Sequence, residues 1–162
     1  AMYGPRTTRL TALHRAVASG LDRARTLHRC LLDPQGTSEL LICRESRNLP
    51  SAPLPAGSDF LWDRRFQVTL DAHTMVASPR IGPLGAAGWR QIRPENGRNL
   101  APAVRKTLPV LWQGDRVVSG PILGLEAPDA GFSTRFSSVQ ALLPIPFAVV
   151  SRAEIPIFTK VN

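Results

Sequence analysis

Residues 108–122 read Leu-Pro-Val-Leu-Trp-Gln-Gly-Asp-Arg-Val-Val-Ser-Gly-Pro-Ile, and this stretch decides the class of fold. Two apolar runs, 108–112 and 116–122, flank the turn residues Gln113-Gly114-Asp115. Apolar runs separated by a short glycine-containing segment are typical of a β-hairpin, in which the two strands are antiparallel. The stretch therefore predicts an antiparallel strand pair.

Further short apolar runs lie on both sides of this hairpin. Strands are predicted at 26–32 and 39–46 around the turn Asp33-Pro34-Gln35-Gly36, at 60–70 with a kink at Asp63-Arg64-Arg65, at 75–81, and at 141–150, which Pro144 and Pro146 interrupt. Residues 47–58 hold three prolines and one glycine, which predicts an extended surface connection. A short helical turn is predicted after Trp89, and a short basic helix at 101–107.

In the amino-terminal region the apolar residues recur with a different spacing. Leu10, Leu13, Val17 and Leu21 recur at helical spacing after the capping residues Thr7 and Thr8, which predicts an amphipathic helix over about 7–24. The predicted fold is therefore α+β: a helical segment at 1–25, followed by a mainly antiparallel β-rich module at 26–162 with short helices.

The composition is that of a folded protein, with 43% hydrophobic and 20% charged residues in a chain of 162. The apolar runs are far shorter than the roughly 18 residues that span a bilayer, and no signal-peptide pattern is visible at the amino end. We therefore expect a cytoplasmic protein without a membrane partner. Two cysteines predict neither a disulfide scaffold nor a four-ligand zinc site.

The chain is strongly basic, and the excess charge is uneven. It has 20 basic and 12 acidic residues, a net charge of +8. Residues 1–32 hold six cations and one acid, and residues 80–116 hold seven cations and two acids, so each block carries +5. Lys106 and Lys160 are the only lysines, so the basic surface is mostly planar guanidinium groups that pair with phosphate and stack on bases. Such blocks favour nucleic-acid binding, with a solvated basic surface as the alternative.

Catalytic and metal-binding patterns are weak by comparison. No local motif joins serine, histidine and aspartate into a triad. His28, Cys30 and Cys43 are only three candidate metal ligands, with Cys43 expected opposite Cys30, and we interpret the two thiols as core residues. The spacing of Gly82, Gly85 and Gly88 matches no nucleotide-binding loop, so these residues predict a tight turn. We expect no catalytic residues, no metal and no cofactor in this chain.

Cationic side chains lie near Trp62, Trp89 and Trp112, a combination that suits RNA, whose phosphates are held by charge and whose bases stack. At least two of the three tryptophans are expected to be core residues. The cations expected to contact RNA are Arg44, Arg47, Arg64, Arg65, Arg90, Arg93, Arg105 and Lys106.

Five segments occur in the order of a known family. They are Thr26-Leu27-His28-Arg29-Cys30, against Thr-Leu-Gly-Gly-Cys in the family; Arg44-Glu45-Ser46-Arg47, against Arg-Glu-x-Arg; Trp62-Asp63-Arg64-Arg65-Phe66, against Trp-Asp-Gly-Arg-Phe; 84–89, against Leu-Gly-x-x-Gly-Trp; and 105–112, against Arg-x-Thr-Leu-Pro-x-Leu-Trp. Over about residues 7–150 the chain resembles the carboxy-terminal half of tRNA(Ile)-lysidine synthetases of alphaproteobacteria. His28-Arg29 and Arg64 depart from the family because they stand where it has glycine.

The resemblance implies a role in tRNA modification. The complete enzymes of this family are ligases that use ATP and lysine to convert the wobble cytidine of an isoleucine tRNA with a CAU anticodon to lysidine. Their amino-terminal catalytic domain carries a Ser-Gly-Gly-x-Asp-Ser loop, which this sequence lacks. We therefore expect the substrate-recognition part, with residues 1–25 as the end of a helical linker domain, without the catalytic domain and without binding of ATP.

Two other interpretations stay open. The module could mainly brace the catalytic domain of the same enzyme or a homodimer, with its charge incidental. A small independent enzyme would require a pocket in which titratable groups converge, and the sequence does not predict one.

Overall fold

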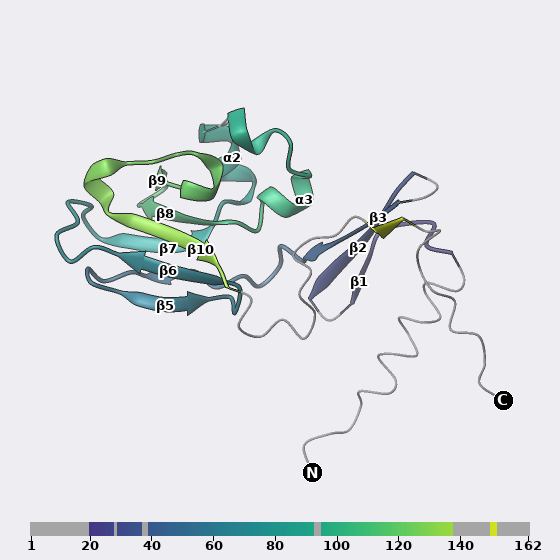
Figure 1. The fold of residues 1–162 in the computed structure, drawn as a ribbon, viewed down its shortest axis with the longest axis horizontal. Coiled ribbons are helices and arrows are strands. Elements are labelled where there is room, and N and C mark those ends of the chain that lie inside the picture. Colours follow the sequence, from purple (N-terminus) through teal and green to yellow (C-terminus); the bar gives the residue numbers. More distant parts are fainter. Residues whose placement is uncertain (1–19, 28, 37–38, 93–94, 138–149, 152–162) are drawn as a thin grey trace, which may run out of the picture. The chain divides into compact units, whose positions relative to one another are not determined.

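The computed structural model describes residues 20–27, 29–36, 39–92, 95–137 and 150–151. The chain divides into two compact units, one made of Ala1–Glu45 with Ile145–Asn162 and the other of Ser46–Pro144 (Figure 1). The sequence predicts a boundary after residue 25 instead. That boundary stays a prediction, because residues 1–19 lie outside the described part.

The first unit is a four-stranded antiparallel sheet with the strand order β1-β2-β3-β11. Its strands are β1 (Arg25–Leu27), β2 (Cys30–Gln35), β3 (Glu39–Arg44) and β11 (Val150–Ser151). Leu21, Leu32 and Leu40 form its small buried core, because inward-facing side chains of neighbouring strands meet on one face.

The predicted strand at 26–32 is in fact two strands joined by a tight turn. Leu27 pairs with Cys30, so only residues 28 and 29 connect β1 to β2, and Arg29 has a left-handed backbone with φ of 66°. The sequence prediction missed this turn because neither position carries the glycine or asparagine that usually marks it.

The turn predicted at 33–36 is also wrong, because β2 continues through Asp33-Pro34-Gln35 and pairs there with β3. Proline is tolerated inside this strand because β1 ends opposite Leu32, so Pro34 has a strand neighbour on one side only. The cysteines are not opposite one another, since Cys30 pairs with Arg44 and Leu31 with Cys43. Successive side chains alternate, so the two thiols point to opposite faces of the sheet.

Most of the predicted amino-terminal helix lies outside the described residues. Its last part, residues 20–24, is described and is not helical, so the helix does not extend to residue 24 as predicted. Of the strand predicted at 141–150, residues 141–149 also lie outside the described part, and Val150 begins β11.

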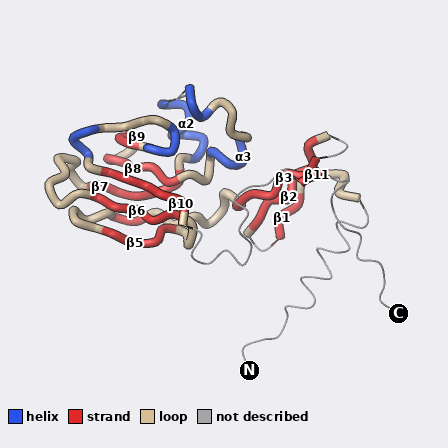
Figure 2. Tube along the Cα trace, in the orientation of Figure 1, coloured by secondary structure: helices blue, strands red, loops and turns tan. Residues whose placement is uncertain are grey.

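The second unit consists of two antiparallel sheets and several short helices (Figures 1 and 2). One sheet has the order β10-β6-β5 and contains β5 (Asp59–Trp62), β6 (Phe66–Leu70) and β10 (Phe132–Phe136). The other has the order β4-β7-β8-β9 and contains β4 (Ala52–Pro53), β7 (Pro79–Pro83), β8 (Pro109–Gln113) and β9 (Arg116–Ser119). The helices are α2 (Gly85–Ile92) and α3 (Pro102–Arg105), with 3-10 turns η1 (Glu95–Gly97), η2 (Pro121–Leu123) and η3 (Pro128–Ala130).

One hydrophobic core joins these two sheets. Phe66, Val68 and Leu70 are buried on alternate positions of β6, and they belong to the same cluster as Ile81 and Leu111 of the other sheet. Trp62 and Trp112 are also buried in this cluster, which confirms that at least two tryptophans are core residues. Burial of side chains this large contributes about 1.5–3 kcal/mol each.

Helix α2 packs on β9 and closes the edge of its sheet. A methyl group on Gly88 would lie 2.8 Å from Leu84 Cδ1 and 3.1 Å from the Trp112 ring, so a larger residue would force these buried side chains to shift. Gln91 donates from Nε2 to the carbonyl of Asp115 at 2.7 Å and accepts from Val117 N at 3.0 Å. The side-chain amide of Gln91 thus bonds backbone groups at the edge of β9, as a neighbouring strand would.

The 108–122 hairpin is confirmed as β8 and β9, and the short helix predicted at 101–107 is confirmed as α3. The stretch 60–70, predicted with a kink at 63–65, is the strand pair β5 and β6. The helical turn predicted after Trp89 begins earlier, at Gly85, so Gly88 lies inside α2 and not in the tight turn predicted from Gly82, Gly85 and Gly88. The strand predicted at 75–81 begins only at Pro79. Met75 is 82% exposed, and Ser78 has a positive φ of 48°, so the chain turns before it enters β7. Strand β10 was not predicted. The overall prediction of mainly antiparallel sheets with short helices holds, and no helix of the described residues is long and apolar enough to cross a membrane.

The turn between β5 and β6 allows a test of backbone strain. Asp63 and Arg64 have φ of 46° and 58°, the left-handed pair that favours Asp-Gly in such hairpins. Replacing Arg64 by glycine should therefore raise the free energy of unfolding by about 0.5–1 kcal/mol, measured by urea denaturation. Arg64→Ala removes the same side chain but keeps Cβ, and should give no such gain. If the two variants were equally stable, the claim that the left-handed backbone at Arg64 is strained would be contradicted.

Candidate nucleic-acid interface

The end of α3 and the start of α2 are bonded to each other and bring together three predicted contact residues. The amide of Gly85, whose φ is 61°, donates to the carbonyl of Lys106 at 3.0 Å, and Leu84 N donates to the carbonyl of Leu108 at 2.8 Å. Both helices lie at the same end of the second unit (Figure 1). We call Trp89, Arg90, Arg105 and Lys106 the basic corner.

Arg105 stacks on an aromatic ring within the basic corner. Its guanidinium carbon lies 3.9 Å from the centroid of Trp89, well inside the range of a cation–π contact. Gly97 also packs closely against this ring, since a methyl group on it would be 2.9 Å from Trp89 Cζ3. The ring is therefore fixed from one side, and it holds the guanidinium in a defined orientation. A stacked guanidinium keeps its N–H groups at its edge, where they can bind a phosphate.

The other two cations of the basic corner, Arg90 and Lys106, are exposed, and Arg105 is half-buried. Arg90 makes a long hydrogen bond from Nε to the carbonyl of Ala86 at 3.4 Å. Among the described residues, none of these three cations forms an ion pair with a carboxylate. Their charge is therefore not neutralised locally, which is what binding of a polyanion requires.

Arg65, also predicted to contact RNA, is instead engaged inside the second unit. Its Nε forms an ion pair with Asp63 at 2.7 Å, and its Nη2 donates to the carbonyl of Thr107 at 3.0 Å. Its guanidinium carbon also lies 5.1 Å from the ring centroid of Phe66. These contacts tie the β5–β6 turn to the segment before β8, so the geometry gives Arg65 a structural role.

Three further predicted contacts are described by the structure. Arg64 is exposed at the tip of the β5–β6 turn, and Arg47 is exposed in the connection before β4. Arg44 belongs to the first unit and donates from Nη1 to the carbonyls of Arg29 and Glu45 at 3.1 and 2.9 Å. Arg93 lies outside the described residues. Of the predicted contacts, the structure therefore brings Arg90, Arg105 and Lys106 together in the basic corner.

One cation that the sequence prediction omitted is Arg80 on β7. Its guanidinium carbon lies 5.2 Å from the ring centroid of Trp112, and the two residues are paired across β7 and β8. The signal that could have found it is the alternation Arg80-Ile81-Gly82, in which a core residue stands between two positions of the opposite face.

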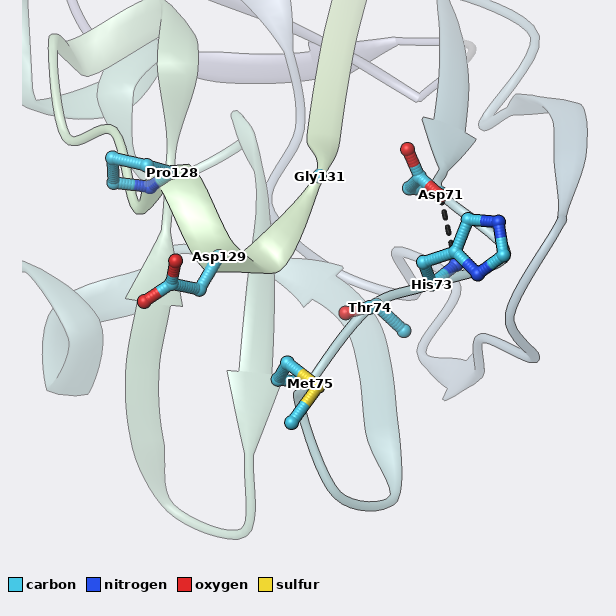
Figure 3. Close-up of a pocket in the computed structure, with 7 residues that line it drawn as sticks. All are labelled: Asp71, His73, Thr74, Met75, Pro128, Asp129 and Gly131. Carbon is cyan, nitrogen blue, oxygen red and sulfur yellow. Dashed lines mark hydrogen bonds between the residues drawn. The ribbon is translucent and has the colours of Figure 1, made fainter.

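A shallow cavity of about 270 Å³ lies between the loop after β6 and the loop before β10 (Figure 3). Its lining residues are Asp71, His73, Thr74, Met75, Pro128, Asp129 and Gly131. The Asp71 carboxylate accepts a hydrogen bond from the backbone amide of His73 at 2.8 Å, and the carboxylate of Asp129 points away from both (Figure 3). The three titratable groups therefore do not converge as an enzyme site would require.

The described residues contain no group of three or more histidine, cysteine or acidic side chains that could hold a metal ion. Cys43 is buried and Cys30 half-buried, and neither forms a disulfide.

Comparisons with protein-family models, with curated proteins and with solved structures found no match to this chain.

Proposed function

We propose that this chain is the tRNA-binding, substrate-recognition portion of a tRNA(Ile)-lysidine synthetase. In this role it holds the isoleucine tRNA with a CAU anticodon for a separate catalytic domain, which uses ATP and lysine to modify the wobble cytidine. The chain itself does not catalyse the reaction.

The observation that carries the RNA-binding part of the proposal is the basic corner. It combines an arginine stacked on a tryptophan, Arg105 on Trp89 at 3.9 Å, with the exposed cations Arg90 and Lys106. Charge-assisted contacts to phosphate supply most of the affinity for RNA, and a stacked guanidinium fixes their direction.

Backbone geometry at two turns supports the resemblance to the lysidine synthetases. The family has glycine where this chain has Arg29 and Arg64, and both residues have left-handed backbones, with φ of 66° and 58°. A residue other than glycine rarely adopts this conformation, so these positions have the backbone for which glycine is suited.

The test of the proposal is a titration of the purified chain with two unmodified transcripts, an isoleucine tRNA and a methionine tRNA, at low and high salt. We expect salt-sensitive binding that favours the isoleucine tRNA, because phosphate contacts release counterions and recognition adds to them. Equal binding of both tRNAs would mean that the chain binds RNA without specificity for the isoleucine tRNA. Absence of binding at low salt would contradict the proposal.

One observation favours the bracing role as a second candidate function. Strand β5 lies at the edge of its sheet, and its Phe60 and Leu61 are 37% and 36% exposed. An exposed edge strand with apolar side chains can pair with another protein surface. If this role is correct, the chain should restore lysidine formation to a separately purified catalytic domain although it binds tRNA weakly.

A further inference from the structure

Three hydrogen-bond donors converge around Gly82, on the face of β7 opposite to that of Ile81. Arg80 and Gly82 share this face with Trp112, whose strand pairs with β7, and Ser51 lies just before β4 on the other side. A methyl group on Gly82 would lie 3.0 Å from Ser51 Oγ, 3.1 Å from Arg80 Nη1 and 3.4 Å from Trp112 Nε1. We call the place that these three donors surround the Gly82 notch.

The indole N–H in this notch has no protein acceptor. Trp112 is only 7% exposed, and its Nε1 is buried and donates to no acceptor among the described residues. By comparison, the indole of Trp62 donates to the carbonyl of Pro50 at 3.2 Å. A buried donor without an acceptor costs free energy, so an acceptor that reaches Trp112 Nε1 would be favoured.

The Arg80 side chain covers the notch, and its hydrogen bonds there can be replaced by hydrogen bonds to solvent or to a ligand. Its Nη1 donates to Ser51 Oγ, and its Nη2 makes a long contact of 3.4 Å to the carbonyl of Gly114. Both contacts lie at the exposed surface, so water or an anion can replace them at small cost. An outward turn of the guanidinium would uncover Trp112 Nε1 and the Ser51 hydroxyl and would leave the positive charge beside them.

We propose that the Gly82 notch binds a phosphate group of the RNA backbone, held by Arg80, Ser51 Oγ and Trp112 Nε1. Phosphate oxygens accept several hydrogen bonds at once, and a guanidinium matches their geometry. That the phosphate belongs to RNA rests on the proposed function, whereas the notch as a phosphate site depends only on the geometry. The notch would add a contact from residues outside the basic corner, among them Arg80, which is not one of the cations predicted to contact RNA.

The direct test follows the three indole N–H signals by nitrogen-15 NMR in a phosphate-free buffer. The full chain is titrated with inorganic phosphate, with the dinucleotide UpU, and with uridine as the control that lacks phosphate. We expect the Trp112 signal, assigned with Trp112→Phe, to shift with phosphate and with UpU and to stay unchanged with uridine. The Trp62 signal should stay unchanged throughout, because that N–H is already bonded to Pro50. An unmoved Trp112 signal would overturn the notch.

A variant extends the test to tRNA. Gly82→Ala places a methyl group in the notch without changing the net charge, and should weaken tRNA binding about tenfold, or about 1.4 kcal/mol. Ser51→Ala should weaken it less, and Ser133→Ala, which removes an exposed hydroxyl on β10, should leave it unchanged. An unchanged Trp62 signal in Gly82→Ala shows that the fold is intact. Full tRNA affinity in a folded Gly82→Ala protein would overturn the assignment to RNA.

These outcomes separate the two proposals. If tRNA binds but the Trp112 signal does not move, the notch is wrong and the proposed function stands. If inorganic phosphate and UpU move that signal but tRNA does not bind, the notch holds phosphate, its assignment to RNA is overturned, and the proposed function fails.

Discussion

Replacing Arg105 and Lys106 together by glutamine should weaken tRNA binding by about ten- to a hundredfold at low salt, because two phosphate contacts are lost. The stacked position of Arg105 on Trp89 makes it the better oriented of the two cations. The dependence of log K on log salt should also become flatter, by about 1.5 in slope, since each phosphate contact contributes about 0.7–0.9. The measurement is a tRNA titration at four or more salt concentrations.

The matched control removes two exposed arginines that lie outside the basic corner, Arg23 in the first unit and Arg135 on β10. Arg23→Gln with Arg135→Gln has the same net charge as the test variant, so any general effect of charge appears in both. If the control loses as much affinity and slope as the test variant, binding depends on overall charge and not on the basic corner.

Arg65→Ala should lower the free energy of unfolding by about 2–4 kcal/mol, because it leaves a partly buried carboxylate without its cation. The side chains of Arg65 and Asp63 are 15% and 7% exposed, and the same guanidinium holds the carbonyl of Thr107. Urea denaturation measures the loss. The tRNA affinity of the folded variant should stay within about twofold of the wild type.

Arg64→Ala is the control for this prediction, since it removes the neighbouring, exposed arginine from the same turn. It should change stability by less than about 0.5 kcal/mol, as is usual for surface positions without special contacts. A stable Arg65→Ala protein with clearly weakened tRNA binding would contradict the structural role and return Arg65 to the interface.

The elements predicted correctly are those whose turns carry their usual residues. The β8–β9 hairpin has Gly114 with φ of 55° at its turn, so local chemistry and the fold agree there. The β5–β6 turn was recognised from the charged run Asp63-Arg64-Arg65, although Arg64 stands at a left-handed position. The β1–β2 turn was missed because Arg29 stands at a left-handed position that glycine normally occupies. At Pro34 a turn was predicted where the chain forms a strand. A proline fits there because β1 pairs with β2 only as far as Leu32, so Pro34 is bonded to β3 alone.

The candidate site was predicted in part for a similar reason. Charge runs identify cations, but they do not tell which cations the fold uses for itself. Arg65 forms internal contacts, whereas Arg105 lies on a ring that comes from a different helix. The Gly82 notch depends on the pairing of β7 with β8, which places Arg80 opposite Trp112. These two residues are far apart in the sequence, so no local pattern predicts that they are neighbours.

The most direct measurement of the central claim is ultraviolet crosslinking of the chain to unmodified isoleucine tRNA, followed by mass spectrometry of the crosslinked peptides. If the basic corner holds RNA, adducts should map to residues 85–106, and the Arg105→Gln, Lys106→Gln variant should lose most of them. Adducts confined to other parts of the chain, with residues 85–106 unmodified, would contradict the account.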